Sequence, residues 1–208
     1  MRIASAVEYD GSAFCCWQRQ DHARSVQGDV EAALSKVADH DVRVVCAGRT
    51  DSGVHASWQI IHFDTRAERS ERSWVRGTNA NLPHDAGLLW AREVDAGFHA
   101  RFSAQSRCYR YIILNRDVPS ALLRRRVTWV RQALDESRMQ EGARYLLGER
   151  DFSSFRAANC QSTTPMRRML RIGVSRSSNR VELTFRANAF VYHIVRNLVG
   201  TLVVIARR

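Results

Sequence analysis

The chain reads AGRTDSGVHA from Ala47 to Ala56, and the residues on either side determine how this stretch is held. Val42–Cys46 before it and Gln59–Thr65 after it are rich in β-branched and aromatic side chains, which indicates two strands. Gly48–Gly53 combines glycine with short polar side chains, a composition typical of loops. The sequence therefore predicts a polar loop held between two strands.

The rest of the first half carries both strand and helix patterns. Arg2–Tyr9 places apolar side chains on one face at a period of two, which predicts a first strand. Ser25 is a suitable N-cap for a helix whose apolar positions recur at helical spacing over Val26–Val37. A second helix is expected over Ser70–Asn81 and another strand over Leu88–Val94. The first half is therefore expected to be mixed, with more strands than helices.

The second half shows the same kinds of pattern. Its expected elements are two strands, a helix closed by a glycine, a hairpin and a final apolar helix, at Cys108–Leu114, Val127–Val130, Asp135–Leu147 with Gly148, Met166–Phe185 and Phe190–Ala206. In the hairpin, apolar positions mostly alternate with arginines or other polar residues: Met166, Leu170, Ile172 and Val174, then Val181, Leu183 and Phe185. This alternation predicts a strand face that packs on the core.

Two halves of similar helix and strand content indicate an α+β protein. The fold class that we expect is a pair of pseudo-duplicated halves forming a central antiparallel sheet flanked by helices, although no residue-level repeat is visible. With 208 residues, the chain has room for two small domains. The expected domains are residues 1–104, which carry the loop that contains Asp51, and residues 105–208, which are basic.

Charge is distributed unevenly along the chain. The formal net charge is +11 and the isoelectric point is near 10.4, yet residues 1–104 have net −2 and residues 105–208 have net +13. Arginine supplies nearly all of the basic residues, since Lys36 is the only lysine. A GC-rich genome would explain arginine over lysine but not this asymmetry. Nucleic acid is therefore the expected partner.

Composition excludes several classes of protein. Hydrophobic residues make up 45% and charged residues 25%, with 11 Gly and 3 Pro, which excludes disordered, collagen-like and low-complexity chains. The five cysteines are odd in number and lack zinc-site spacing, so neither a disulfide framework nor a metal site is expected.

The N-terminus has no signal-peptide pattern. Phe190–Ala206 is apolar but short for a bilayer and interrupted by polar residues. A cytoplasmic protein with no membrane contact is expected.

The loop contains groups that can do chemistry. Arg49 lies two residues before Asp51, so it can pair with the carboxylate and keep it ionised, as a nucleophile or a base requires. A surface turn with a local ion pair is the alternative, and spacing alone does not decide between the two. The segment lacks the lysine and the glycine spacing of a phosphate-binding P-loop.

The loop resembles the signature of the TruA family of tRNA pseudouridine synthases, and the resemblance covers essentially the whole chain. The matching segments follow one another in family order: Tyr9–Ser12, Trp17–Gln20, Ser25–Gly28, Ala47–Ala56, Asn81–Pro83, Phe98–Ala104, Arg107–Tyr111, Asp151–Arg156, Cys160–Gln161, Asn188–Phe190 and Val195–Asn197. The resemblance implies the pseudouridine synthase fold and isomerisation of uridine at positions 38–40 in the anticodon stem-loop of tRNA. It also implies a homodimer that needs no cofactor and no metal.

The resemblance also implies roles for individual residues. Asp51 matches the catalytic aspartate, which either attacks C1′ of the ribose or removes a proton from C2′. Tyr109 matches a tyrosine that stacks on the target base, although core packing on a shared strand face with Tyr111 is the alternative. Arg49 and Arg196 are expected to contact the substrate. Arg196 also stands within an apolar run, where a buried guanidinium would require an anionic partner.

Two clusters of arginine remain open to both interpretations. Arg124–Arg126 and Arg167–Arg168 could contact the tRNA backbone or form a solvated face.

The chain departs from the family pattern in three places. Cys16 and Trp58 stand where the family has glycine, so strain is expected if either position needs a positive φ. The chain stops at Arg208, where the family continues for several dozen residues. The alternative function is therefore a catalytically impaired tRNA-binding remnant. A folate- or sugar-type small-molecule enzyme is a third hypothesis, which the charge of the second half opposes.

Overall fold

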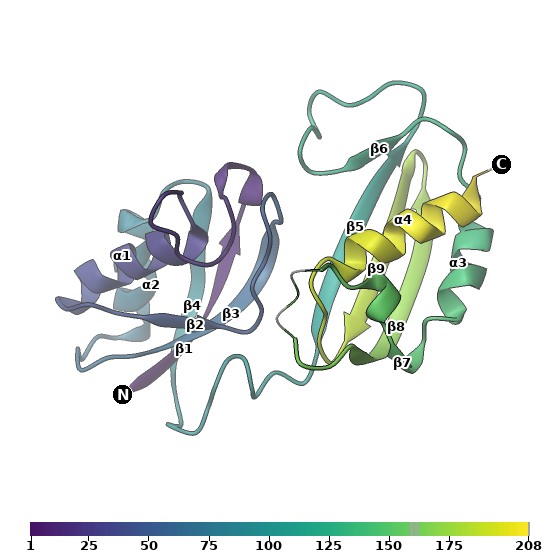
Figure 1. Ribbon diagram of the computed structural model, residues 1–208. Helices are drawn as coiled ribbons and strands as arrows, with labels where there is room; N and C mark the ends of the chain where they lie inside the picture. Colours follow the sequence, from purple (N-terminus) through teal and green to yellow (C-terminus); the bar gives the residue numbers. More distant parts are fainter. Residues whose placement is uncertain (159, 161, 208) are drawn as a thin grey trace. The chain divides into compact units, whose positions relative to one another are not determined.

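Each half of the chain folds around its own sheet (Figure 1). The computed structural model describes residues 1–158, 160 and 162–207. The chain divides into two units, Met1–Ala104 and Gln105–Arg208. Both units combine a sheet with helices, so the predicted α+β class is confirmed. The strands form two hydrogen-bonded sheets, one in each unit.

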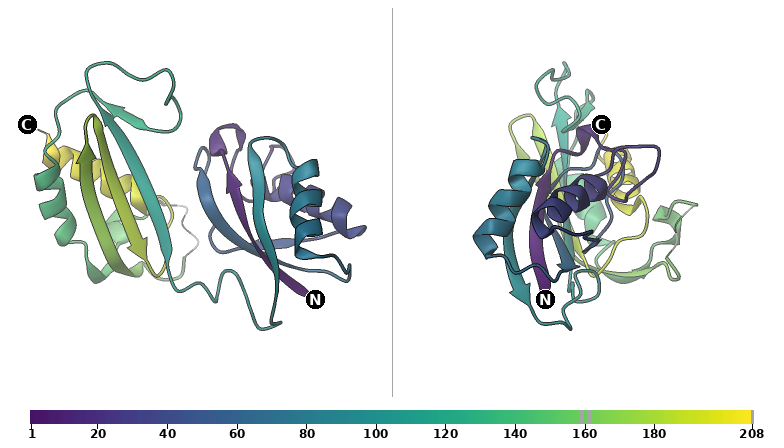
Figure 2. Two further views of the ribbon diagram at one scale, coloured as in Figure 1. Left: turned by 180° about the vertical axis from the view of Figure 1, so that it is seen from behind. Right: turned by 90° about the vertical axis from the view of Figure 1, so that its left-hand side faces the viewer.

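The first unit contains a four-stranded antiparallel sheet. Its elements in chain order are β1 (Arg2–Tyr9), α1 (Val26–Ala38), β2 (Val44–Cys46), β3 (Ala56–Asp64), α2 (Glu71–Asn81) and β4 (Ala86–Val94). The strand order is β2-β3-β1-β4, which makes β1 a central strand paired with both β3 and β4. Both helices lie on one side of this sheet (Figure 2).

Both helices of the first unit begin where the sequence predicts, because a serine caps each of them. The Ser25 hydroxyl accepts a hydrogen bond from the Gly28 N–H at 3.2 Å, and Ser70 caps α2 in the same way through Ser73. The apolar face of α1 is buried against the sheet and packs with Trp74 of α2. Burial of these faces accounts for most of the stability that the helices gain.

The second unit contains a five-stranded sheet. Its elements are β5 (Arg107–Asn115), β6 (Thr128–Val130), α3 (Glu136–Arg144), β7 (Gly148–Asp151), β8 (Met166–Ser177), β9 (Arg180–Ala187) and α4 (Ile194–Ala206). The strand order is β6-β5-β9-β8-β7, and the predicted hairpin forms its centre. The β5–β6 pair is parallel, unlike the antiparallel pairing that the sequence suggests. Helices α3 and α4 share one core with the sheet.

The predicted helix over residues 135–147 is too long. Helix α3 ends at Arg144, and Gly148, with φ of 87°, begins strand β7 instead of closing the helix. All four residues of β7 are exposed, so this strand has no apolar alternation by which the sequence could reveal it.

The prediction of which side chains of β8 face the core is partly wrong. Met166 and Leu170 are 41% and 45% exposed, whereas Arg167 and Met169 are buried. A bulge between Met169 and Arg171 shifts the register against β9, which exchanges the two faces of the strand at that point. Arg167 donates hydrogen bonds to the carbonyl oxygens of Thr164 and Met166, and burial lowers the pKa of its guanidinium. Arg167 is therefore not part of a solvated face.

The final helix begins later than the apolar run. Helix α4 starts at Ile194 after His193, whose φ of 62° lies in the left-handed region. Leu198, Val199 and Leu202 are buried in the core of the unit. Among the described residues, no helix is both long enough and apolar enough to cross a membrane.

Candidate active site

Residues 47–55 connect the ends of β2 and β3, as the sequence predicts. The Ala47 N–H donates to the carbonyl oxygen of Ile60 at 2.8 Å, which extends the pairing of the two strands. The Gln59 side chain, which is buried, donates to the carbonyl oxygen of Gly48 at 2.5 Å. The first two residues of the loop are therefore fixed to β3.

Thr50 anchors the middle of the loop in the core. Its side chain is only 8% exposed, and its hydroxyl lies 2.7 Å from the hydroxyl of Tyr9 on β1. The Thr50 carbonyl oxygen accepts a hydrogen bond from the Trp17 N–H at 2.9 Å. Arg49 on one side of Thr50 is exposed, and Asp51 on the other side is half-buried. The inward threonine thus presents the arginine and the aspartate on the outside of the loop.

A tight turn follows Asp51. The Val54 N–H donates to the Asp51 carbonyl oxygen at 3.2 Å, and Gly53 has φ of 73°, which favours glycine. The neighbouring turn after β1 packs directly on this segment, because a Cβ atom added to Gly11 would lie 2.1 Å from the Val54 carbonyl oxygen. The Gly11 N–H also donates to Nδ1 of His55 at 3.1 Å. The turn that follows Asp51 is therefore fixed by close packing.

Positive charge surrounds the base of the loop. Burial raises the pKa of the Cys46 thiol to about 11, while the guanidinium groups of Arg49 and Arg101 act in the opposite direction. Both guanidinium groups are thus close enough to interact electrostatically with Cys46, the last residue of β2 before the loop. A half-buried carboxylate in such surroundings can act as a nucleophile or as a base.

Two histidines lie close together in the first unit, His62 on β3 and His99 in the segment that follows β4. The Ala100 N–H donates to Nδ1 of buried His62 at 3.1 Å, and the rings of His62 and His99 lie 4.8 Å apart. Burial lowers the pKa of His62, and the charges of Arg2 and His99 add to this effect. The neutral imidazole of His62 therefore accepts this hydrogen bond and holds the segment around Ala100 in place.

This cluster predicts a dependence of stability on pH. Since the folded state lowers the pKa of His62 below the ordinary value of 6.5, the unfolded state takes up the proton first, and the stabilisation is lost as the pH falls below about 6.5. The His62→Gln variant should be less stable than the natural protein at about pH 7.5, and this difference should narrow towards about pH 5.5. Urea unfolding across this range measures it. Parallel pH profiles for the two proteins would show that His62, which Asp64, Arg2 and His99 face, does not determine the slope.

Tyr109 and Arg196 belong to the second unit. Tyr109 lies on β5, half-buried, with its ring edge-to-face against Phe190 at 4.8 Å. Neighbouring Tyr111 packs on the core, and its hydroxyl lies 2.7 Å from that of Thr128. Arg196 is exposed in the first turn of α4. The expectation that Arg196 is buried within an apolar helix is therefore wrong, because the helix begins only two residues before it and turns this position outward.

The structure thus brings two of the four predicted site residues together, Arg49 and Asp51 on one loop. Tyr109 and Arg196 lie on separate elements of the other unit. Sequence reasoning missed Tyr9 and Thr50, which position the loop. The signal that could have found Thr50 is a short polar residue directly between the two outward-facing charges.

The two residues that replace family glycines cause no backbone strain. Among the described residues, the non-glycine positions with positive φ are Asp39, Arg125, Ser178 and His193, so Cys16 and Trp58 adopt ordinary conformations. Trp58 is 61% exposed on β3, with its ring 6.3 Å from that of Trp90.

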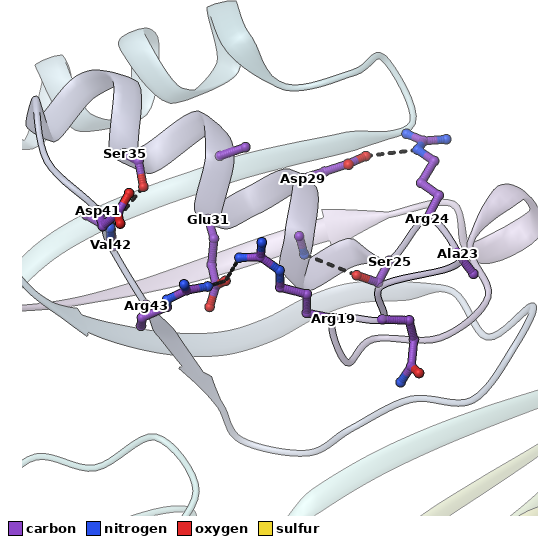
Figure 3. A pocket seen from close by; sticks show the side chains of 13 residues that line it. Arg19, Ala23, Arg24, Ser25, Asp29, Glu31, Ser35, Asp41, Val42 and Arg43 are labelled. Atoms are coloured by element: carbon purple, nitrogen blue, oxygen red, sulfur yellow. Dashed lines mark hydrogen bonds and ion pairs between the residues drawn. The ribbon is translucent and has the colours of Figure 1, made fainter.

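A second polar feature of the first unit is a pocket of about 410 Å³ beside α1 (Figure 3). Its buried carboxylate, Glu31, accepts hydrogen bonds from Arg43 at 3.0 Å and from the Val44 N–H at 3.0 Å, and Arg19 lies 3.6 Å away. Arg24 pairs with Asp29 and Asp85, which lowers the pKa of Asp85. Because these cations are met by carboxylates, the charges in the pocket compensate one another, and we assign it no ligand.

Comparison with known proteins identifies the family. The family model described as tRNA pseudouridine synthase matches residues 5–103 and 143–208. The chain belongs to the TruA family of tRNA pseudouridine synthases. It is 54% identical over 204 residues to tRNA pseudouridine synthase A of Coxiella burnetii strain Dugway 5J108-111, with 98% of this chain and 78% of the relative covered.

Two other members of the TruA family match the chain to a similar extent. The chain is 56% identical over 205 residues to tRNA pseudouridine synthase A of Methylococcus capsulatus, covering 99% of this chain and 76% of that one. It is 54% identical over 203 residues to the synthase of Actinobacillus pleuropneumoniae serotype 7, covering 98% and 78%. As a tRNA pseudouridine synthase, the chain is an isomerase. Within the described residues, no three His, Cys, Asp or Glu side chains gather in a way that could hold a metal ion.

Proposed function

We propose that this protein isomerises uridine to pseudouridine at positions 38–40 of the tRNA anticodon stem-loop, with Asp51 as the catalytic carboxylate. The observation that carries this proposal is the position of Asp51. It follows a core-anchored threonine in the loop that matches the family signature, and it remains half-buried.

The reaction rearranges bonds without a net change in composition. The bond between N1 of the base and C1′ of the ribose breaks, the base turns, and C5 bonds to C1′. The hydrogen leaves C5 as a proton, and N1 regains a proton. The Asp51 carboxylate serves either by forming a transient bond to C1′ or by removing the C2′ proton, and both routes need one ionised carboxylate.

The remaining predicted residues are proposed to handle the RNA. The uridine must leave its stack, which costs a few kcal/mol. Tyr109, half-buried near the start of β5, is the residue that we propose offsets this cost by stacking on the base. Arg49 and Arg196 are both exposed and can contact phosphates. We also propose that the enzyme acts in the cytoplasm as a homodimer, as the family resemblance implies.

Tritium release tests the proposed reaction. Formation of the bond from C5 to C1′ expels the C5 hydrogen, so tRNA that carries 5-tritiated uridine should release label to water when the protein is added. Substrates with a single labelled uridine at position 38, 39 or 40 would assign the sites. Binding of tRNA without any release of label would instead support the function of a tRNA-binding protein.

Binding of tRNA should depend steeply on salt. The net charge of +13 on residues 105–208, much of it on exposed arginines such as Arg124–Arg126, should neutralise several phosphates. We expect affinity to fall about a hundredfold or more between about 50 and 200 mM salt. Anisotropy of fluorescent tRNA measures the slope, and Arg124→Gln should reduce it by about one if this residue contacts a phosphate. Affinity that does not change with salt would contradict the assigned role of the basic half.

A further inference from the structure

An exposed aromatic ring stands at the end of the first unit. Phe102 is 75% exposed, in the segment that follows β4. Arg101 beside it is also exposed, and its guanidinium carbon lies 5.6 Å from the centre of the Phe102 ring. A phenylalanine that is exposed to solvent does not gain the free energy that burial of its ring would provide. The position of the Phe102 ring is therefore determined by its contacts with neighbouring groups.

The Phe102 ring is stacked on a neighbouring ring. It stacks on the ring of His99 at 4.3 Å with 27° between the planes. Nδ1 of His99 accepts hydrogen bonds from the N–H groups of Arg101 and Phe102, both at 3.2 Å. The His99 N–H donates to the Ser103 hydroxyl at 3.0 Å, and the Ser103 N–H donates to the His99 carbonyl oxygen at 2.8 Å. The turn therefore presents one face of an ordered aromatic pair.

The turn is also fastened to the sheet. Buried His62 on β3 accepts the Ala100 N–H at 3.1 Å, as described above. Arg2 on β1 donates to the carbonyl oxygens of Ala96 at 2.5 Å and Phe98 at 2.8 Å, and it forms an ion pair with Asp64. Two strands thus fix the position of a segment that has no regular structure of its own.

The turn and the Asp51 loop are both attached to β3, the turn through His62 and the loop through Ala56. His62 pairs with Val45 in β2, and the next residue of β2 is Cys46, where the loop begins. The guanidinium groups of Arg49 and Arg101 both act on the Cys46 thiol. The segment that carries the ring leaves β4 at Val94, opposite Arg2, whereas the Asp51 loop enters β3 at Ala56, opposite Tyr9 at the other end of the sheet.

We propose that His99–Phe102 forms a stacking platform for an unpaired nucleotide of the RNA, with Phe102 on the base and Arg101 near the adjoining phosphate. This inference rests on the proposed function and adds a binding residue to it. A ring fixed face-out beside a guanidinium matches a base and its phosphate, since aromatic stacking and positive charge are how proteins hold single-stranded nucleotides. Paired nucleotides offer no free base face, so the platform selects RNA that contains a loop.

Two labelled RNAs test the platform in binding experiments with the full chain. One is the anticodon stem-loop, and the other is a blunt duplex with the same number of phosphates. Phe102→Ala should weaken binding of the stem-loop about tenfold and leave duplex binding within twofold. Phe102→Tyr should bind like the natural protein, because it keeps the ring. Arg101→Gln should weaken binding of the stem-loop more than binding of the duplex, because the guanidinium is proposed to contact the phosphate beside the stacked base. Tyr145→Ala is the matched control, since Tyr145 is 74% exposed in the other unit.

The outcomes separate this inference from the proposed reaction. Unchanged stem-loop binding by Phe102→Ala, equal loss on both RNAs, or the same loss in Tyr145→Ala would overturn the platform. Thermal unfolding of each variant checks that the fold is retained, which is expected for an exposed side chain. If the natural protein released no tritium while stem-loop binding still required Phe102, the isomerisation would be wrong and the platform would stand. Tritium release with Phe102-independent binding would refute the platform alone.

Discussion

Replacing Asp51 by asparagine is expected to reduce tritium release at least about a thousandfold while tRNA affinity stays within about threefold. Asparagine keeps the size and shape of the side chain, but its neutral amide cannot attack C1′ or take the C2′ proton. Loss of a group that acts only in the chemical step lowers kcat and leaves binding largely intact. Single-turnover release with saturating enzyme, together with anisotropy of labelled tRNA, measures the two effects separately.

Asp21→Asn provides the charge control for this variant. Asp21 is an exposed acid of the same unit, outside the loop, so its replacement changes net charge equally and should leave release unaltered. If Asp51→Asn retained substantial turnover, another group would have to be the catalytic carboxylate. If it lost binding and activity together, Asp51 would be a positioning residue of the loop.

Replacing Gly11 by alanine should destabilise the first unit by about 3 kcal/mol and disable catalysis. The added Cβ atom would lie 2.1 Å from the oxygen and 2.6 Å from the carbon of the Val54 carbonyl group, so the backbone of one turn must move. Because Val54 also hydrogen-bonds to Asp51, the displacement reaches the catalytic loop. Differential scanning calorimetry should show a decrease in Tm of about 10 °C or more for this unit.

Gly87→Ala is the control for the Gly11 prediction. Gly87 lies on β4 in the same unit, and the nearest atom to a Cβ added there is a side-chain oxygen of Asn79 at 3.9 Å, an ordinary contact. We expect nearly natural stability and activity from this variant. Equal losses from both substitutions would mean that steric contact with Val54 is not the cause.

Local signals in the sequence predicted most of the elements. Ser25 and Ser70 mark the starts of α1 and α2 because a serine hydroxyl caps the helix within three residues. The alternation in β9 predicts its buried face, whereas β1 is a central strand whose residues 3–7 are buried on both faces. By contrast, the bulge in β8 and the wholly exposed strand β7 depend on pairing partners, which a local pattern does not report.

The sequence predicted which residues of the candidate site could do chemistry, but not which residues hold them in place. Arg49 and Asp51 are visible as a polar pair, and their catalytic roles stay a prediction. The Tyr9–Thr50 hydrogen bond joins residues 41 positions apart, and no spacing rule connects them. The exposure of Arg196 depends on where α4 begins, which is set by the left-handed backbone at His193. Such features arise from tertiary packing.

The anchoring of Thr50 in the core has a kinetic consequence for the encounter with RNA. A loop that is already ordered by its hydroxyl and carbonyl contacts loses its conformational entropy when the chain folds, and little remains to be lost on association. The protein side of the complex can then accept RNA without first rearranging this loop. Under the proposed function, the slow and energetically costly motion of each cycle is then that of the nucleotide, which must leave its helix to reach the Asp51 carboxylate.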